Sequence, residues 1–324
     1  LYGEIVMRLL FLVQKEQRVI LDRLYESIGR HAGECDIRWL DSDEQANLKR
    51  YFREKVDTSR YDRILFFLRF KKEMRQWRFI RTIPNLAILE HDAYQNYIPN
   101  KYCGKYARHY HRMPWVRVLS SGAHVTQRLQ QENIDAVFIP KGYDQALIIH
   151  QHKPRTIELG FVGSLKSGVY QQRKTFLESL ATTEKMEIVR TKSGQDYVDK
   201  LNSIRFFVSA DIGMGEYMIK NFEAMAAGCV LFGWRQGNGE EKALGFRDME
   251  NIVLYSSMEE CREKIAQLRT DPALADRIAL AGQTLVEQKY SFEALGQKIA
   301  EALQVPLRER KDFPLTLRQR LFGR

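Results

Sequence analysis

Lys220 and Glu223 stand three residues apart in a segment whose residue types suit an anionic, hydroxyl-bearing ligand. Residues 220–227 have a helical composition and are followed by Gly228, a residue that commonly ends helices. A helix N-terminus favours anions, and the ammonium group of Lys220 adds a positive charge near it. The carboxylate of Glu223 offers two acceptor oxygens, which suit two neighbouring sugar hydroxyls.

The residues around this segment predict a parallel α/β unit. The apolar runs 204–208 and 229–232 are long enough for buried strands, and the loop 211–216 contains two glycines. Strand, loop, helix and strand in this order are typical of a parallel sheet, whose ligands bind at the carboxyl ends of the strands. The alternative is an ordinary glycine turn before an amphipathic helix, with no ligand.

The first half of the chain predicts a second parallel sheet. Apolar runs at 8–13, 35–40, 63–68 and 86–89 read as strands, and the segments between them are helical or polar. Strands separated by helices imply a doubly wound parallel sheet. Residues 14–17 replace the glycine-rich turn of a dinucleotide fingerprint, so this half is not expected to hold a pyrophosphate in that way.

His91 and Asp92 directly follow the fourth of these strands. An imidazole at a strand end could hydrogen-bond a substrate or accept a proton, although a surface histidine beside an acid is the plainer reading. Next come Tyr94 and the segment 101–112, which is dense in Tyr, Arg, Lys and His and includes Lys105 and Arg108. Aromatic faces stack on sugars and basic groups bind phosphate or carboxylate, so Asp92, Tyr94, Lys105 and Arg108 are the predicted acceptor-binding residues. The alternative is a solvated basic loop.

The second half opens with a strand and turn at 157–164. Gly163 and Ser164 would let the backbone approach a ligand, and Lys166 lies close by in sequence. Arg190 and Lys192 follow the strand at 186–190 and could hold a phosphate, or they are a solvated strand end.

Composition limits the class of protein. A chain of 324 residues with 44% hydrophobic and 28% charged residues suggests two soluble globular domains. The net charge of +10 leaves nucleic acid, an anionic membrane and an anionic substrate open, but no zinc spacing, RNA-binding aromatic motif or helix-turn-helix pattern is present. Four widely spaced cysteines indicate reduced thiols and a cytoplasmic protein. No apolar run is long enough to span a bilayer, and the histidines lack metal-ligand spacing.

The stretch Glu223-Ala224-Met225-Ala226-Ala227-Gly228 resembles the signature of GT-B glycosyltransferases, namely the group 1 and family 4-like enzymes that use nucleotide sugars. The resemblance is specific from about Val116 to Ala302. It implies that Glu223 binds the ribose of the donor. It also implies that Lys220 and Asn221, with Gly163, Ser164, Lys166, Arg190 and Lys192, form the nucleotide-sugar site, in which cations hold the diphosphate. His91 would face the transferred sugar.

One position departs from the family pattern. Retaining members usually carry a glutamate eight residues before the ribose-binding one, and Gly215 stands there in this chain. The nearest acid is Glu216, seven residues before Glu223. Glu216 is therefore the second candidate catalytic residue beside His91, and retention of the anomeric configuration is expected from the resemblance alone.

The resemblance implies an α/β protein of the GT-B fold, with two facing Rossmann-like doubly wound parallel-sheet domains and a cleft between them. Residues 1–150 would be the acceptor-side domain, residues 151–305 the nucleotide-sugar domain, and residues 306–324 a basic tail that packs back or faces a membrane.

The expected activity is transfer of a sugar from a nucleotide donor to a glycan or glycolipid in bacterial envelope polysaccharide or lipopolysaccharide synthesis. No metal cofactor and no nucleic acid are expected, and peripheral contact with the inner membrane face is left open. The alternatives are a GT-B nucleotide-sugar epimerase and a non-catalytic glycan- or nucleic-acid-binding protein.

Overall fold

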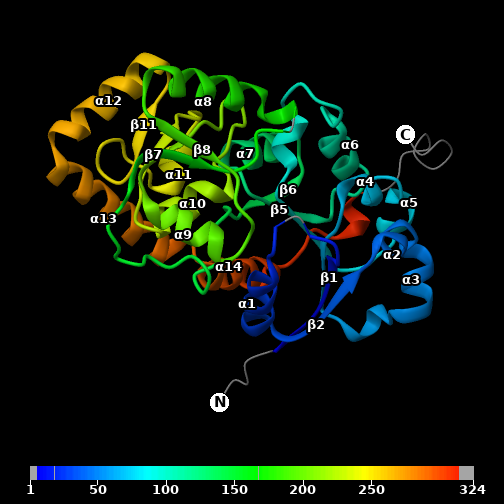
Figure 1. The fold of residues 1–324 in the computed structure, drawn as a ribbon. Coiled ribbons are helices and arrows are strands. Elements are labelled where there is room, and N and C mark those ends of the chain that lie inside the picture. The colour runs from blue at the N-terminus through cyan, green and yellow to red at the C-terminus, as the bar shows by residue number, and fades with distance from the viewer. Residues whose placement is uncertain (1–5, 18, 167, 314–324) are drawn as a thin grey trace. The chain divides into compact units, whose positions relative to one another are not determined.

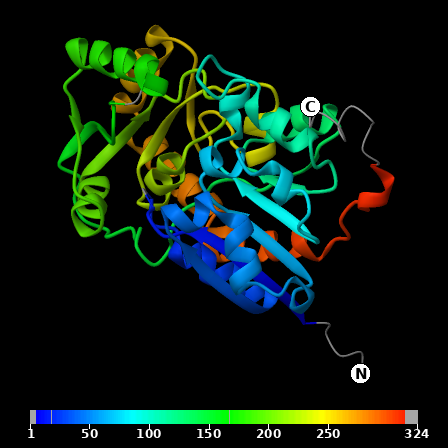
Figure 2. The ribbon, with the colours of Figure 1, turned by 90° about the vertical axis from the view of Figure 1, so that its right-hand side faces the viewer.

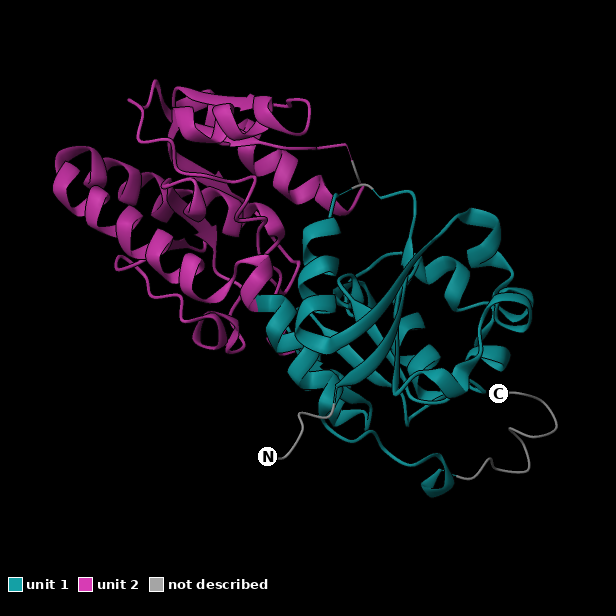
Figure 3. Ribbon diagram, turned by 90° about the horizontal axis from the view of Figure 1, so that it is seen from below, with its two compact units in different colours: residues 1–121, 125–139, 295–324 teal, residues 122–124, 140–294 magenta. Residues whose placement is uncertain are grey.

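The structure is a computed structural model that describes residues 6–17, 19–166 and 168–313. Figure 3 shows its two compact units. Unit 1 comprises residues 1–121, 125–139 and 295–324, and unit 2 comprises residues 122–124 and 140–294. Within the described parts of the chain, each unit contains one parallel sheet.

Unit 1 is built on a six-stranded sheet with the order β2-β1-β3-β4-β5-β6 (Figure 1). Its strands are β1 (Met7–Gln14), β2 (Gly33–Leu40), β3 (Arg63–Phe67), β4 (Leu86–Glu90), β5 (Arg117–Ser120) and β6 (Asp135–Phe138). The predicted apolar runs at 8–13, 63–68 and 86–89 form β1, β3 and β4, because a parallel sheet covered by helices buries both faces of its inner strands. The run at 35–40 forms β2, an edge strand that is mostly half-buried or exposed. Figure 2 shows the blue and cyan strands of this sheet running side by side.

The helices of unit 1 are amphipathic: an apolar face packs toward the core and a polar face is exposed to solvent. They are α1 (Asp22–Ala32), α2 (Ser42–Ala46), α3 (Leu48–Lys55), α4 (Phe70–Glu73), α5 (Trp77–Ile80), α6 (Lys105–His111), α7 (Ala123–Gln131) and α14 (Phe292–Gln304). Short 3-10 turns lie at Thr58–Arg60, Ala93–Asn96 and Arg310–Asp312. A capping box fixes the start of α2. The side chain of Asp41 accepts the backbone N–H of Glu44, and the side chain of Glu44 accepts the backbone N–H of Asp41.

Unit 2 contains a five-stranded sheet with the order β11-β10-β9-β7-β8. Its strands are β7 (Ile157–Val162), β8 (Met186–Val189), β9 (Ile204–Ser209), β10 (Val230–Trp234) and β11 (Val253–Tyr255). The order reverses between β7 and β9, because β8 lies on one side of β7 and the later strands lie on the other. In open α/β sheets such a reversal leaves a crevice at the carboxyl ends of the two strands.

The helices of unit 2 follow the strands as a doubly wound sheet requires. They are α8 (Gln171–Thr183), α9 (Gln195–Ser203), α10 (Ile219–Ala226), α11 (Glu240–Leu244), α12 (Met258–Thr270) and α13 (Pro272–Lys289), with a 3-10 turn at Gly168–Tyr170. The predicted start of α13 is confirmed: Asp271 accepts the N–H of Leu274, and Pro272 occupies the first turn.

The two units divide the chain at different residues from the predicted ranges. Residues 140–150 lie in unit 2, where Tyr143 exchanges backbone hydrogen bonds with Tyr290 and Phe292. Most of α14 lies in unit 1, because Gly296 packs so closely on buried Ser27 of α1 that a Cβ atom would overlap its hydroxyl. The sequence analysis placed both segments by chain order, whereas their packing partners are distant in sequence.

The first part of the predicted tail packs on unit 1. Arg308 donates hydrogen bonds to the carbonyls of Pro114 and Asn133, and the rings of Phe313 and Trp115 are in contact. Residues 314–324 of the predicted tail lie outside the described residues. Among the helices that the structure describes, each is too short or too polar to cross a bilayer.

Candidate functional site

The carboxyl ends of β7 and β9 bring together the two loops that the sequence analysis singled out. The loop that begins at Gly163 follows β7, and the loop from Asp211 to Met218 follows β9 and leads into α10. This is the reversal point of the sheet in unit 2, where the topology favours a ligand. The helix that carries Lys220 and Glu223 therefore starts at the expected edge of the sheet.

Tyr197 of α9 joins the two residues that opened the sequence analysis. Its hydroxyl donates a hydrogen bond to the Glu223 carboxylate and accepts one from Lys220 Nζ at 3.4 Å. The ammonium group also lies over the tyrosine ring, 4.5 Å from its centroid. Tyr197 thus fixes both groups at once, and it occupies only one of the two carboxylate oxygens of Glu223 in the hydrogen bonds of the described residues.

Gly163 makes room for the lysine side chain. A Cβ atom at this position would lie 2.7 Å from Lys220 Cε and 2.9 Å from the ring of Phe161. Any other residue would therefore push the lysine out of its place or distort the strand end. The backbone N–H of Gly163 donates a hydrogen bond to the carbonyl of Val189 at 3.0 Å and is therefore used within the sheet.

The charges of the pair are perturbed by burial and by neighbouring cations. Burial lowers the pKa of Lys220, and the nearby charges of Arg173 and Arg190 lower it further, while Glu223 and Asp211 act in the opposite sense. Burial raises the pKa of Glu223, against the effects of Lys220 and of the Tyr197 hydrogen bond. A partly desolvated ammonium group surrounded by further cations is suited to binding a polyanion.

The Asp211 carboxylate stabilises the start of α10. This buried carboxylate pairs with Arg173 of α8, accepts the side-chain amide of Asn221 at 2.7 Å and accepts the backbone N–H of Met218 at 3.1 Å. The carboxylate therefore joins α8, 38 positions away in sequence, to the start of α10. Because Met218 is the N-cap position of α10, this network sets where the helix with Lys220 and Glu223 begins.

Two predicted ligand-contacting residues have structural partners instead. Asn221 is fully buried and bonded to Asp211 and to the Met218 carbonyl, which argues against contact with a nucleotide sugar. Glu216 is 1% exposed and forms an ion pair with the buried Lys141. The Glu216 carboxylate is thus enclosed with its counter-ion in this geometry, and its catalytic role stays a prediction.

Glu240 is a further buried acid near this pair. Its carboxylate accepts the backbone N–H of His124 at 3.1 Å. Burial raises the pKa of Glu240 to about 8, and the charge of Glu216 contributes to the rise. At neutral pH the Glu240 side chain is therefore largely protonated.

The other predicted donor residues of unit 2 lie near the surface. Ser164 is half-buried, and its hydroxyl accepts the backbone N–H of Lys166 at 3.3 Å. Lys166, Arg190 and Lys192 are exposed, which leaves their charged groups accessible to a ligand. Of these three, Arg190 is close enough to Lys220 to affect the lysine's pKa.

In unit 1, His91 and Asp92 follow β4 as predicted. The imidazole of His91 is half-buried and packs edge-on against Phe67, with 5.1 Å between ring centroids, whereas Asp92 is exposed. Asp92 donates its backbone N–H to the buried Glu90 at 2.7 Å, and Tyr110 donates its hydroxyl to the same carboxylate. Burial raises the pKa of Glu90 well above its usual value, and this carboxyl group holds the turn that carries His91 through the N–H of Asp92.

The predicted acceptor residues separate into two groups. Tyr94 is 5% exposed, so its ring is part of the core of unit 1 and does not offer a face to a sugar. Lys105 is half-buried beside the Tyr102 ring, and Arg108 is exposed on α6. Both cations can therefore reach a ligand, whereas Tyr94 is buried and its acceptor-binding role stays a prediction.

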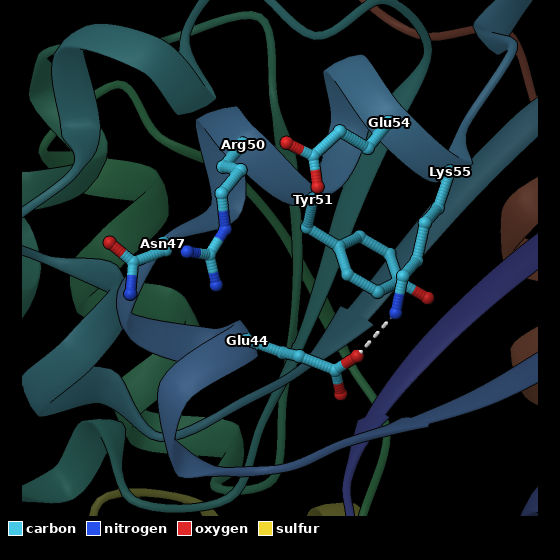
Figure 4. A pocket seen from close by; sticks show the side chains of 6 residues that line it. All are labelled: Glu44, Asn47, Arg50, Tyr51, Glu54 and Lys55. Atoms are coloured by element: carbon cyan, nitrogen blue, oxygen red, sulfur yellow. Dashed lines mark hydrogen bonds and ion pairs between the residues drawn. The ribbon is translucent and has the colours of Figure 1, made fainter.

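A small pocket on α2 and α3 contains none of the predicted site residues. Figure 4 shows the six side chains that line this cavity of about 280 Å³, which include Glu44, Arg50 and Lys55. The Lys55 ammonium is 2.8 Å from Glu44, and Arg50 pairs with Asp43 outside the drawn set. These cations already have carboxylate partners, so the pocket offers little to an anionic ligand.

Sequence reasoning missed Tyr197 and Arg173 and gave Asp211 no role. Both Tyr197 and Arg173 stand in helices where a tyrosine on an apolar face or an arginine among polar residues is unremarkable. Asp211 had a signal, since it is the first acid after a buried strand and it begins the glycine loop. No group of three or more His, Cys, Asp or Glu side chains in the described residues is placed to bind a metal.

Comparisons with known proteins agree with this arrangement. Residues 148–301 match the sequence model of the glycosyl transferase-like family. No curated protein sequence gives a significant match to the chain.

Solved structures resemble nearly the whole chain at low sequence identity. HepE from Anabaena in complex with UDP-glucose is 13% identical with a TM-score of 0.65, over 93% of this chain and 100% of that one. The T4 phage BGT structure with its UDP-glucose substrate is 13% identical with a TM-score of 0.60, over 93% and 100%. A glycosyltransferase from Rickettsia africae is 12% identical with a TM-score of 0.60, over 93% and 98%.

At these identities the structural matches establish the fold alone, and the family match is limited to residues 148–301. The predicted α/β class with two parallel sheets is confirmed, while the predicted cleft stays a prediction. The chain therefore has the GT-B fold, and its residues 148–301 are similar to the glycosyl transferase-like family.

Proposed function

We propose that the protein transfers a sugar from a nucleoside diphosphate donor to a hydroxyl of a glycan or glycolipid, with retention of anomeric configuration. UDP is the first donor nucleotide to test, because the HepE and T4 BGT structures are complexes with UDP-glucose. The proposed setting is bacterial envelope polysaccharide or lipopolysaccharide synthesis at the cytoplasmic membrane face. Retention and setting rest on the resemblance of residues 223–228 to the family signature.

The placement of Lys220, Tyr197 and Glu223 at the carboxyl ends of β7 and β9 carries this proposal. Lys220 binds the diphosphate together with Arg190 and the loop at Gly163 and Ser164, where Lys166 and Lys192 add positive charge. Glu223 accepts hydrogen bonds from the ribose hydroxyls. The charge on the leaving diphosphate grows in the transition state, so these cations stabilise the transition state more than the bound donor.

His91 is proposed to contact the transferred sugar, and Asp92, Lys105 and Arg108 are proposed to bind the acceptor. A divalent metal is not required in this scheme, because protein cations neutralise the leaving group. Activity should therefore persist in EDTA. A loss of activity in EDTA that magnesium or manganese restores would contradict this part of the proposal.

Thermal unfolding in the presence of candidate donors tests the function directly. A bound donor raises the midpoint of unfolding, because it stabilises the folded state only. We expect UDP-sugars to raise it, and GDP-, ADP- and dTDP-sugars serve as the comparison set. A donor that binds is then incubated with lipid-linked or soluble glycan acceptors, and NMR of the product gives the anomeric configuration. Consumption of the donor without any acceptor would favour the epimerase instead.

The lowered pKa of Lys220 predicts a pH dependence of nucleotide binding. The diphosphate requires the charged ammonium, so affinity should fall as the pH rises through the lowered pKa and the free lysine loses its proton. The decrease should approach about tenfold per pH unit above that pKa. Calorimetry of UDP binding between about pH 7 and 10 measures it.

Lys220→Arg is the matched control for this effect, because a guanidinium stays charged throughout the range. Its UDP affinity should vary much less with pH than that of the unmodified protein. Parallel pH profiles for the two proteins would show that Lys220 does not titrate against the ligand.

A further inference from the structure

The positive charge of the chain is concentrated in one segment of unit 1. Residues 69–115 contain ten Lys and Arg against three Asp and Glu, so they carry seven of the ten net charges. Two of the three acids, Glu73 and Glu90, are 1% and 7% exposed and face the core. The charged groups at the surface of this segment are therefore almost all cationic, which favours an anionic partner.

A groove along α6 lies within this segment. The groove has a volume of about 930 Å³ and is lined by Asn96, Gly104, Ala107, Arg108, His111, Arg112 and Glu132. It is several times the size of the pocket on α2 and α3, and its volume lies at the upper end of the range for small-molecule sites. The α6 groove contains none of the residues of the donor site in unit 2.

The arginines of the α6 groove repel one another. Burial lowers the pKa of Arg112, and the charges of Arg108 and Arg78 lower it further. Within the described part of the chain, none of these three arginines forms an ion pair with a carboxylate. Like charges held together without a counter-ion cost free energy, which a bound anion would recover.

The acid of the α6 groove does not neutralise these arginines. Glu132 accepts a hydrogen bond from Tyr97 at 2.9 Å, and its other carboxylate oxygen lies 3.8 Å from His111 Nε2. His111 also contacts the Glu132 carbonyl at 2.9 Å. Glu132 thus interacts with Tyr97 and His111, and the guanidinium groups of Arg108 and Arg112 are available to an anionic ligand.

The aromatic rings beside the α6 groove argue against a nucleic acid as the ligand. Arg112 lies over Trp77 at 4.6 Å from the ring centroid, and Arg128 lies over Tyr97 at 3.6 Å. Lys101 lies over Tyr102 at 5.1 Å. Single-stranded nucleic acids bind through bases stacked on open aromatic faces, and cations cover these faces.

We propose that the α6 groove binds a phosphate group through Arg108 and Arg112. Guanidinium groups bind phosphate oxygens in a bidentate manner, and two of them match the double charge of a phosphate ester. The phosphate belongs either to a soluble molecule or to a lipid headgroup. Its assignment to the sugar acceptor rests on the proposed function, whereas phosphate binding itself does not.

Binding of inorganic pyrophosphate tests the groove. The measurement uses calorimetry in a Lys220→Ala background, so that the donor site does not contribute. We expect R108A/R112A to bind pyrophosphate about tenfold or more weakly, because each arginine supplies charge-assisted hydrogen bonds. K49A/R53A is the matched control, because it removes two exposed charges from α3 of the same unit. Since Arg112 also covers Trp77, Arg108→Ala alone provides a second variant.

Vesicles distinguish the source of the phosphate. In a sedimentation assay, phosphatidylcholine vesicles with and without phosphatidic acid are compared. Binding to phosphatidic acid that R108A/R112A loses and K49A/R53A keeps assigns a lipid headgroup, and pyrophosphate binding alone assigns a soluble ligand.

Equal binding of both probes by R108A/R112A and K49A/R53A, or no binding of either probe, overturns the proposal. A failure of the proposed function looks different. In that case UDP binding would be absent in the unmodified protein while the groove variants still lose pyrophosphate.

Discussion

Glu223→Ala is expected to weaken UDP binding about a hundredfold and to abolish sugar transfer. The carboxylate is proposed to accept two ribose hydroxyls, and charge-assisted hydrogen bonds are worth roughly 1.5–3 kcal/mol each. The substitution removes a half-buried acid whose pKa is raised by desolvation, so we expect no large loss of stability. Calorimetry of UDP binding and the midpoint of thermal unfolding measure the two effects separately.

Three variants serve as controls for this result. Glu178→Ala removes an exposed acid of the same unit and should leave binding unchanged. Glu223→Gln keeps an acceptor for Tyr197 but loses the charge, so we expect a smaller loss. Tyr197→Phe frees the Glu223 carboxylate and removes the Lys220 contact, which should weaken binding about tenfold. UDP affinity that is the same in Glu223→Ala and in the unmodified protein would refute the proposed donor site.

Asp211→Ala is expected to lower the free energy of unfolding by about 3–5 kcal/mol. The substitution leaves the buried guanidinium of Arg173 without a counter-ion and removes the acceptor for Asn221 and for the N–H of Met218. For a unit of this size the midpoint of thermal unfolding should fall by roughly 10 °C. Differential scanning calorimetry without ligand measures the shift.

A double substitution separates loss of charge balance from loss of packing. Arg173→Met added to Asp211→Ala removes the uncompensated charge, so stability should partly return. Asp276→Ala is the control, because this acid pairs with Arg205 at the surface and should cost little. If the double variant is as unstable as Asp211→Ala, the cost does not come from the unpaired arginine.

Most of the secondary structure could be predicted from local patterns. The runs at 8–13 and 204–208 are apolar at every or nearly every position and became β1 and β9. Only burial on both faces explains such runs, and helices on both sides of a parallel sheet provide that burial. The N-cap of α13 at Asp271 and the end of α10 before Gly228 were also predictable, because each depends on only one or two residues.

The site was predicted in outline but not in its contacts. Lys220 and Glu223 share α10, so their proximity followed from helical spacing. Tyr197 could not be assigned, because it belongs to another helix, α9, and its contacts with Lys220 and Glu223 lie 23 and 26 positions away in sequence. The burial of Glu216, Asn221 and Tyr94 could not be predicted either, because each residue type is polar enough to suit a surface and is buried by partners from other segments.

The sequence alone determined the alternation of strands and helices, the glycine loop and the helix that carries a cation and an acid. These features follow from periodicity and from backbone preferences, which act over a few residues. The tertiary structure alone decided which charges are paired, since Asp211 meets Arg173 across 38 positions and Lys141 meets Glu216 across 75. It also decided that Arg108 and Arg112 have no carboxylate partner among the described residues, because whether a charge finds a partner depends on distant segments that no local pattern encodes.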